Sequence, residues 1–201
     1  MDNKILETER LFLTPFKVQD AEELYAYAKD PDVGPHAGWK PHESVEESKM
    51  IIEGMFIPTG AFCIRLKDKD GKPGKLIGSI ALETDRFRPD ARSKEIGYSL
   101  DRKEWGKGYM TEAAGEIIRY AFENLDMEIL TICTSPVNER SQRVAEKNNF
   151  QYEGKIRKAY RIYTGQLRDS LVFSLAKEDW NKTGQLDSTI EKDLQIQQRN
   201  L

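Results

Sequence analysis

One stretch, Glu95 to Ala114, constrains the fold of this chain more than any other. Its first part, Glu95 to Leu100, alternates apolar residues with polar or small ones, which predicts a strand. From Tyr109 onward apolar residues recur at three- and four-residue steps, which predicts an amphipathic helix. A charged loop with two glycines, Asp101 to Gly108, joins the two. The chain must therefore place a strand, a glycine-rich turn and a helix in direct succession.

The loop between this strand and this helix is suited to hold an anion. The first N–H groups of a helix have no intrahelical acceptor, and the helix dipole adds about half a positive charge there. Gly106 and Gly108 lack the Cβ atoms that would keep a ligand from the backbone, and Lys103 and Lys107 add charge. The pattern predicts a phosphate cradle. A tight turn fits the same residues, since neither common phosphate-loop spacing is present.

Composition limits the partners of the chain. Its 201 residues predict one domain, and the net charge of −3 argues against a nucleic-acid binder that relies on bulk positive charge. Cys63 and Cys133 stand in apolar runs, which favours free thiols in a reducing compartment, and no metal-ligand spacing occurs. No apolar run is long enough to span a membrane, and residues 1–4 are polar. We expect a cytoplasmic protein that binds no nucleic acid, no metal and no membrane.

Hydrophobic periodicity predicts the remaining elements. In chain order we expect a strand at Leu6–Phe16, helices at Ala21–Ala28 and from Ser44, a hairpin of Gly60–Leu66 and Leu76–Leu82, the strand and helix described above, a strand at Met127–Thr134, a helix from Asn138, and closing strands at Phe150–Ile156 and Leu167–Leu175. The strand, helix, strand order implies a parallel pair with a right-handed crossover. The fold class is therefore α/β (α+β).

Local patterns refine three of these elements. Asp20 fits the N-cap of the first helix, and Glu23 completes a capping box. The apolar face of the second helix comprises Val45, Ile52, Met55 and Phe56. The tail, 181–201, is polar except for a helical stripe, which predicts a docked helix at Ser188–Gln198.

Two segments resemble motifs of one known family. Lys103–Gly108 is similar to the Q/R-x-x-G-x-G/A loop of the GNAT acyltransferases, with Lys103 in the Gln/Arg slot. Asn138–Phe150 resembles the N-x-x-S-x-x-V-x-E-K-x-G-F segment of that family, with Asn149 where glycine is usual. The wider run from Ile96 to Ala113 resembles the branch that acetylates protein N-termini, typified by the ribosomal-protein alanine N-acetyltransferases (RimJ/RimL-like).

The resemblance implies a fold and a cosubstrate. It implies one GNAT domain over 1–180, with 181–201 as an extension, built on a mixed, mostly antiparallel sheet with a splayed parallel strand pair, flanked by helices. It also implies that the loop amides hold the pyrophosphate of acetyl-CoA and that Asn138 bonds the pantetheine arm, although a plain helix cap also explains Asn138. The implied acetyl-CoA residues are Ser99, Leu100, Lys103, Trp105, Gly106, Lys107, Gly108, Tyr109, Asn138 and Ser141.

Acetyl transfer from a thioester to an amine has definite chemical needs. The developing oxyanion needs a donor, which the resemblance assigns to a backbone N–H near Ser99 and Leu100. The departing thiolate needs a proton or a donor, since a thiol pKa lies near about 8.5. Ala145 stands where many family members carry a tyrosine, and Ser141 matches the serine of the N-terminal-acetylating branch. Ser141 also fits a residue that caps its helix.

The general base is the least defined role. The acceptor amine must lose a proton, because its pKa lies at about 8 to 10. Glu95 on the central strand is the candidate, and a salt-bridged strand residue is the other interpretation. Tyr160 stands where related ribosomal-protein enzymes carry a glutamate. Glu112 fits a residue that complements the helix dipole, and His36 and His42 fall in the substrate-side loops.

The function expected from these observations is acetyl-CoA-dependent N-acetylation of a primary amine by direct transfer, with a protein N-terminal amine as the first acceptor to consider. An acetyltransferase for a small amine, such as an antibiotic, a polyamine or an amino acid, uses the same motifs. So does a domain that binds acetyl-CoA as a sensor without turnover. The partners are then acetyl-CoA and the amine, with the chain as a monomer or a homodimer.

Overall fold

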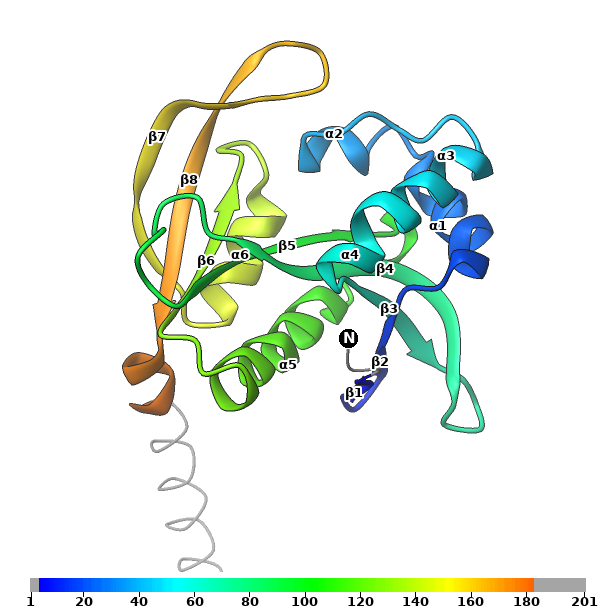
Figure 1. Cartoon of the computed structure of the whole chain (residues 1–201), viewed down its shortest axis with the longest axis horizontal. Coiled ribbons are helices and arrows are strands. Elements are labelled where there is room, and N and C mark those ends of the chain that lie inside the picture. Colours follow the sequence, from blue (N-terminus) through cyan, green and yellow to red (C-terminus); the bar gives the residue numbers. More distant parts are fainter. Residues whose placement is uncertain (1–3, 183–201) are drawn as a thin grey trace, which may run out of the picture.

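The computed structural model describes residues 4–182, and these residues form one mixed sheet with helices on both faces (Figure 1). The strands are β1 (Leu6–Glu7), β2 (Leu11–Pro15), β3 (Phe62–Lys67), β4 (Pro73–Thr84), β5 (Ser93–Leu100), β6 (Ile129–Thr134), β7 (Gln151–Arg161) and β8 (Leu167–Ala176). They lie in the order β1-β2-β3-β4-β5-β6-β8-β7. Each neighbouring pair is antiparallel except β5 with β6.

The parallel strands β5 and β6 part halfway along their length. Residues 93–95 pair with 129–131, and the described ladder between the two strands ends there. Beyond Glu95, β5 continues to Leu100 paired with β4, while β6 continues to Thr134 paired with β8. The mostly antiparallel sheet with a splayed parallel pair, implied by the resemblance, is therefore confirmed.

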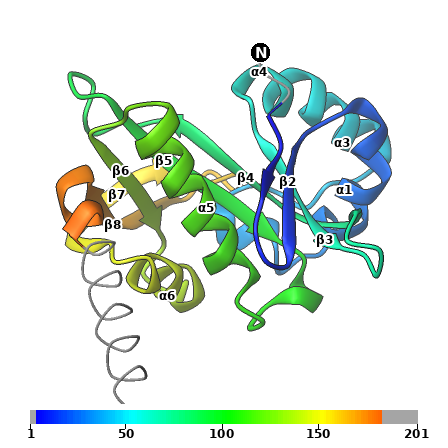
Figure 2. The same ribbon diagram turned by 90° about the horizontal axis from the view of Figure 1, so that it is seen from below.

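Helices pack on opposite faces of the sheet. Figure 2 shows α5 (Tyr109–Asn124) and α6 (Glu139–Lys147) on one face. The other face carries α1 (Ala21–Ala28), α2 (Gly34–Ala37), α3 (Val45–Ile51), the π-helical turn Ile52–Phe56 and α4 (Ile57–Thr59). Because side chains alternate along a strand, Ile80 of β4 joins the core beneath α5 and the next residue, Ala81, joins the core beneath α1.

The single strand predicted at Leu6–Phe16 is wrong. The structure breaks it into β1 and β2, which fold back on each other. The turn between them is closed by Thr8, whose N–H donates to the Leu11 carbonyl at 3.0 Å and whose hydroxyl accepts from the Leu11 N–H at 3.0 Å. This turn contains neither glycine nor proline, so the sequence has no turn signal there and its apolar alternation predicted one continuous strand.

Two local helix predictions also need correction. The side chains of Asp20 and Glu23 form no capping box on α1; both accept instead from Arg65, at 2.7 and 2.8 Å. A partner on β3 thus replaces the local cap. The second helix starts where it was predicted, with Ser44 as its N-cap. Its π-helical turn changes the period, however, and Met55 is 49% exposed rather than inward.

The end of the described chain packs onto the domain. Residues 177–182 are helical, and the ring of Trp180 lies 5.4 Å from that of Phe122 in α5. The predicted helix at Ser188–Gln198 lies outside the described residues. Cys63 and Cys133 are both free thiols; Cys63 is buried and Cys133 is half-buried.

Candidate active site

A cavity of about 980 Å³ occupies the gap where β5 and β6 part. Residues from both faces of the sheet line this cavity. Ser79 and Ser99, which hydrogen-bond to each other, line it on the face that carries α1, and residues of α5 and α6 line it on the other face. Of the residues predicted from the sequence, the cavity brings together Glu95, Ser99, Leu100, Trp105, Gly106, Gly108, Tyr109, Asn138 and Ser141. Lys103 and Lys107 are exposed and do not line it.

The glycine loop has the geometry of an anion cradle. Gly106 and Gly108 have φ angles of +78° and +83°, a conformation that favours glycine. A Cβ on Gly106 would meet none of the described atoms within 4 Å, so the space beside it is open. The N–H of Glu112 donates to the Gly108 carbonyl at 3.0 Å. The amides of residues 109–111 precede that bond and, as at any helix start, lack an intrahelical acceptor.

Positive charge reaches the cavity from α6 rather than from the loop lysines. Lys107 Nζ is paired with Glu104 Oε2 at 2.8 Å. The guanidinium carbon of Arg140 lies 4.0 Å from the ring centroid of Trp105. The cations of α6 that line the cavity are Arg140, Arg143 and Lys147. Their three- and four-residue spacing, which places them on one face of a helix, was visible in the sequence. That this face lines the cavity became clear only from the structure.

Glu112, in the first turn of α5, joins the cradle to the N-terminal turn. Its carboxylate accepts from Thr8 Oγ1 at 2.5 Å, from Arg10 N–H at 2.8 Å and from Arg10 Nε at 2.6 Å. Arg10 Nη1 in turn donates to the Lys107 carbonyl at 3.1 Å. Burial alone would raise the pKa of Glu112, but these hydrogen bonds outweigh it and lower the pKa below its usual value. Glu112 thus supports the loop as well as the helix dipole.

The backbone of β5 presents amides to the gap. Asp101 N–H donates to the Ile77 carbonyl of β4 at 2.7 Å, whereas the Leu100 carbonyl accepts from Trp105 Nε1 at 2.9 Å. Odd-numbered residues of β5 therefore turn their peptide groups toward β4, and by the alternation of an antiparallel ladder Tyr98 and Leu100 turn theirs toward the gap. Of the two predicted positions, Leu100 rather than Ser99 has an amide that faces the cavity.

Asn138 and Ser141 meet at the start of α6. Asn138 Oδ1 accepts from the Ser141 N–H at 3.2 Å, so Asn138 is the helix cap. The buried hydroxyl of Ser141 lies 2.8 Å from the hydroxyl of Tyr98. Burial raises the pKa of Tyr98 to about 12, despite its hydrogen bond to Ser141. Tyr98 is therefore a protonated partner of Ser141 at neutral pH, a pairing that sequence spacing did not predict.

Two glutamates face each other where the strands part. Glu95 is buried, and its oxygens accept from Arg86 Nε at 3.0 Å and Nη2 at 2.8 Å. Glu83 is the register partner of Glu95 on β4, and it is exposed in the cavity wall. Desolvation by that wall and the charge of Glu95 raise the pKa of Glu83, against the opposing charge of Arg86. Sequence reasoning missed Glu83, because only the strand register shows that it faces Glu95.

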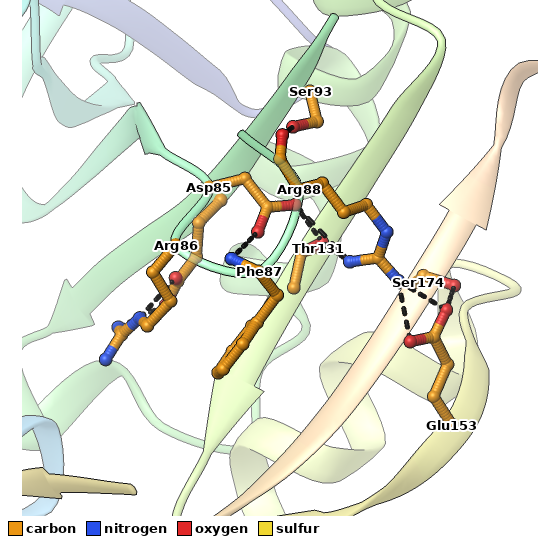
Figure 3. Close-up of polar contacts among 9 residues, drawn as sticks. Asp85, Arg86, Phe87, Arg88, Ser93, Thr131, Glu153 and Ser174 are labelled. Carbon is orange, nitrogen blue, oxygen red and sulfur yellow. Dashed lines mark hydrogen bonds and ion pairs between the residues drawn. The ribbon is translucent and has the colours of Figure 1, made fainter. Parts of the chain in front are cut away.

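A polar network pins the loop that carries Arg86 (Figure 3). The fully buried carboxylate of Asp85 accepts from Thr131 Oγ1 of β6 at 2.6 Å. Arg88 Nη2 donates to both carboxylate oxygens of Glu153 on β7, at 2.5 and 2.6 Å. The network thus ties the loop after β4 to two other strands, and so fixes the position of Arg86.

One end of the cavity lies beneath contacts between α2 and the β7–β8 hairpin. The Tyr163 N–H donates to the Gly38 carbonyl at 3.2 Å, and Arg168 Nη2 donates to the Pro35 carbonyl at 2.9 Å. A Cβ on Gly38 would lie 3.2 Å from a ring carbon of Tyr160. The aromatic and imidazole side chains that line the cavity from these segments are His36, Trp39, His42, Tyr160 and Tyr163.

Residues 4–182 contain neither a metal-binding cluster nor a membrane-spanning helix. No group of three or more His, Cys, Asp or Glu side chains in this range could hold a metal ion. No helix in the same range is long and apolar enough to cross a membrane.

Comparisons with known proteins agree with this geometry. A family model for the acetyltransferase (GNAT) domain matches residues 10–151. The uncharacterized N-acetyltransferase p20 of Bacillus licheniformis is 30% identical over 180 residues, which cover 87% of this chain and 97% of p20. The ribosomal protein uS5-alanine N-acetyltransferase of Escherichia coli is 32% identical over 120 residues, 60% of each chain. A GNAT-family acetyltransferase structure from Bacillus anthracis superposes with a TM-score of 0.75 at 23% identity, over 87% of this chain and 99% of that one.

Proposed function

Because the chain belongs to the GNAT acetyltransferases and is therefore an N-acetyltransferase, we propose that it moves the acetyl group of acetyl-CoA directly to the α-amine of a protein N-terminus. The observation that carries this proposal is the cavity at the splay. It joins an anion cradle on one face of the sheet to a chamber with two glutamates on the other, and backbone amides of β5 stand between them.

Acetyl-CoA fits the face that carries α5 and α6. The open loop at Gly106 and Gly108, with the unpaired amides at the start of α5, accommodates a pyrophosphate. The cations Arg140, Arg143 and Lys147 line the same cavity and complement phosphate charge. The side chain of Asn138 borders the same cavity and reaches the amide-bearing pantetheine arm.

The chemistry then takes place at the parting of the strands. The acceptor amine attacks the thioester carbonyl, whose oxygen gains negative charge. The amides of Leu100 and Tyr98 face that space, and one such preorganised donor contributes about 3 kcal/mol to transition-state stabilisation. Collapse of the adduct breaks the carbon–sulfur bond and yields the amide.

Ser141 serves the leaving sulfur. Its hydroxyl is buried, borders the cavity and is partnered by the Tyr98 hydroxyl. It donates its hydroxyl proton to the thiolate and regains one from the nitrogen of the adduct, while the other proton lost by the acceptor ammonium passes to a general base and then to solvent. The sum is an ammonium plus a thioester giving an amide, a free thiol and one proton. No covalent enzyme intermediate is needed, since both substrates share one cavity.

The choice of a protein N-terminus rests on the E. coli relative, whose name assigns it the alanine of ribosomal protein uS5. A small amine is the second candidate, because the contacts of Tyr163 and Arg168 with α2 close one end of the cavity over the acceptor side. An acetyl-CoA sensor without turnover is the third, and it predicts binding with no thiol release.

The test is an acceptor screen with purified protein and acetyl-CoA. Peptides that begin with Ala, Ser or Thr are compared with polyamines, amino acids and aminoglycosides, and free thiol and acetylated product are both measured. We expect peptide acetylation at the α-amine, located by mass spectrometry. Acetylation of small amines alone would contradict the protein acceptor, and binding of acetyl-CoA without any product would contradict the enzyme.

A further inference from the structure

We propose that Glu83, rather than Glu95, is the general base that takes the proton from the acceptor ammonium, and that Arg86 and Glu95 are its positioning residues. This inference rests on the proposed function. It assigns a catalytic role to a residue that neither the motifs nor the comparisons single out.

The sheet places Glu83 on the acceptor side of the cavity. Glu83 and Glu95 are cross-strand partners, so their side chains share the sheet face that carries Ser79, Ser99 and α1. The carboxylate of Glu83 then lies across Gly97: a Cβ on that glycine would be 2.8 Å from Glu83 Oε1. Gly97 thus leaves the space through which Glu83 reaches the cavity, just before the amide of Tyr98.

The carboxylate of Glu95 is already occupied by another side chain. Both of its oxygens accept from the guanidinium of Arg86, and its side chain is 8% exposed. A carboxylate whose two oxygens both accept from one guanidinium has few lone pairs left for a substrate proton. Glu83 is exposed at the cavity wall and can pass a proton to solvent after each turnover.

The charges around Glu83 come from several elements. Glu95 on β5 raises its pKa and Arg86 on the loop after β4 lowers it, while desolvation is the largest effect and raises it. Cys133 on β6 borders the same space as a neutral thiol, since burial raises its pKa to about 12. The ring of Tyr160 on β7 lies 5.9 Å from the Arg86 guanidinium. The titratable groups that line the cavity from the α2–α3 side are His36, Lys40, His42 and Glu47. A carboxylate whose pKa is raised toward the working pH is a more effective general base.

The proposed step balances. The ammonium of the acceptor gives one proton to the Glu83 carboxylate, which becomes a neutral carboxylic acid, and the freed amine lone pair attacks the thioester carbon. After product release the carboxylic acid of Glu83 loses that proton to water. Glu95 stays paired with Arg86 throughout, and the loop of Arg86 is held by Asp85 and Thr131 (Figure 3).

The test compares carboxylate-to-amide variants at constant size. Glu83→Gln and Glu95→Gln are assayed with Arg86→Gln, and Glu128→Gln serves as a control outside the cavity. The kcat/KM is measured against pH with two acceptors: the best ammonium substrate, and an analogue whose amine is already neutral at the assay pH. In parallel, the carboxyl titration of Glu83 is followed by carbon-13 NMR, which needs no activity.

We expect Glu83→Gln to lose on the order of 100-fold in kcat/KM with the ammonium acceptor but less than about fivefold with the neutral amine. Glu95→Gln should move the NMR titration of Glu83, and the acidic limb of the pH profile, to lower pH, because a negative neighbour is removed and Arg86 is released. Arg86→Gln should move both to higher pH. Glu128→Gln should match the wild type.

Two results would overturn the assignment of the base. One is a Glu83→Gln variant that keeps wild-type kcat/KM and its acidic limb while Glu95→Gln loses them. The other is an equal loss with both acceptors, which would show that Glu83 only supports the structure. If the wild type acetylates no amine at all, the proposed function itself fails, and the base assignment fails with it.

Discussion

Replacing Gly106 with alanine should weaken acetyl-CoA binding without harming the fold more than a matched control does. The control is Gly165→Ala in the β7–β8 hairpin. The two glycines have φ angles of +78° and +84°, and a Cβ on either would meet no described atom within 4 Å. Alanine therefore costs both sites a similar backbone strain, about 1–2 kcal/mol. Only Gly106 lines the cavity.

The expected size of the binding effect follows from the cradle. A Cβ on Gly106 displaces a phosphate from at least one loop amide, and a hydrogen bond to a charged group contributes about 1.5–3 kcal/mol. A loss of about 2 kcal/mol weakens binding roughly 30-fold. At a ligand concentration 100 times the wild-type Kd, acetyl-CoA stabilises the wild type by about 2.7 kcal/mol and the Gly106→Ala variant by about 0.9 kcal/mol.

The assay is thermal unfolding with and without acetyl-CoA. For a domain of this size about 1 kcal/mol corresponds to roughly 2–4 °C. The wild type and Gly165→Ala should thus gain roughly 5–11 °C from the ligand, and Gly106→Ala roughly 2–4 °C. Equal gains for the two alanine variants would refute the cradle as the pyrophosphate site, because their strain is matched and only their position differs.

Three further outcomes are expected. Ser141→Ala should lower kcat, measured in stopped assays, on the order of 100-fold with little change in acetyl-CoA affinity, and Tyr98→Phe should cause a smaller loss of kcat. If calorimetry shows a lower melting temperature while kcat is unchanged, the Ser141–Tyr98 pair has only a structural role. Glu112→Gln should be less stable than the wild type at neutral pH. Because the pKa of Glu112 is lowered in the folded state, its contribution to the free energy of unfolding is present above the unfolded pKa of about 4.3 and disappears as the pH falls through the folded pKa. Urea unfolding should therefore show that the stability difference between the wild type and Glu112→Gln becomes smaller in acid. Asp85→Asn should destabilise the chain by about 1–3 kcal/mol in the same assay, since the carboxylate is fully buried; an unchanged midpoint would show that the network around Arg86 is held by other contacts.

The sequence predicted what depends on local period and on loop composition. The strand, loop and helix around Gly106, the crossover into β6 and the cap at Asn138 all follow from residues close together in the chain. The parallel pairing of β5 with β6 was confirmed for the same reason, since a strand, helix, strand order implies it, whereas the mostly antiparallel sheet was implied by the family resemblance.

Long-range partners explain what the sequence did not reveal. In the sequence Asp20 and Glu23 fit a capping box, but in the fold both carboxylates accept from Arg65 of β3. The lysines of the loop suggested the phosphate charge, yet cations of α6 line the cavity. Glu83 acquires a neighbour only when β4 is aligned with β5. Each of these depends on the register or placement of a distant element, which residue spacing along the chain does not encode.

The divergence of β5 and β6 has a consequence for how such a protein can change over generations. The N–H donors at Tyr98 and Leu100 belong to the main chain, so a substitution that exchanges one side chain for another does not remove them. Among the twenty residues, only proline deletes the N–H. Substitutions at these positions can therefore change the side chains of the cavity wall, while the main-chain N–H groups proposed as oxyanion donors are retained.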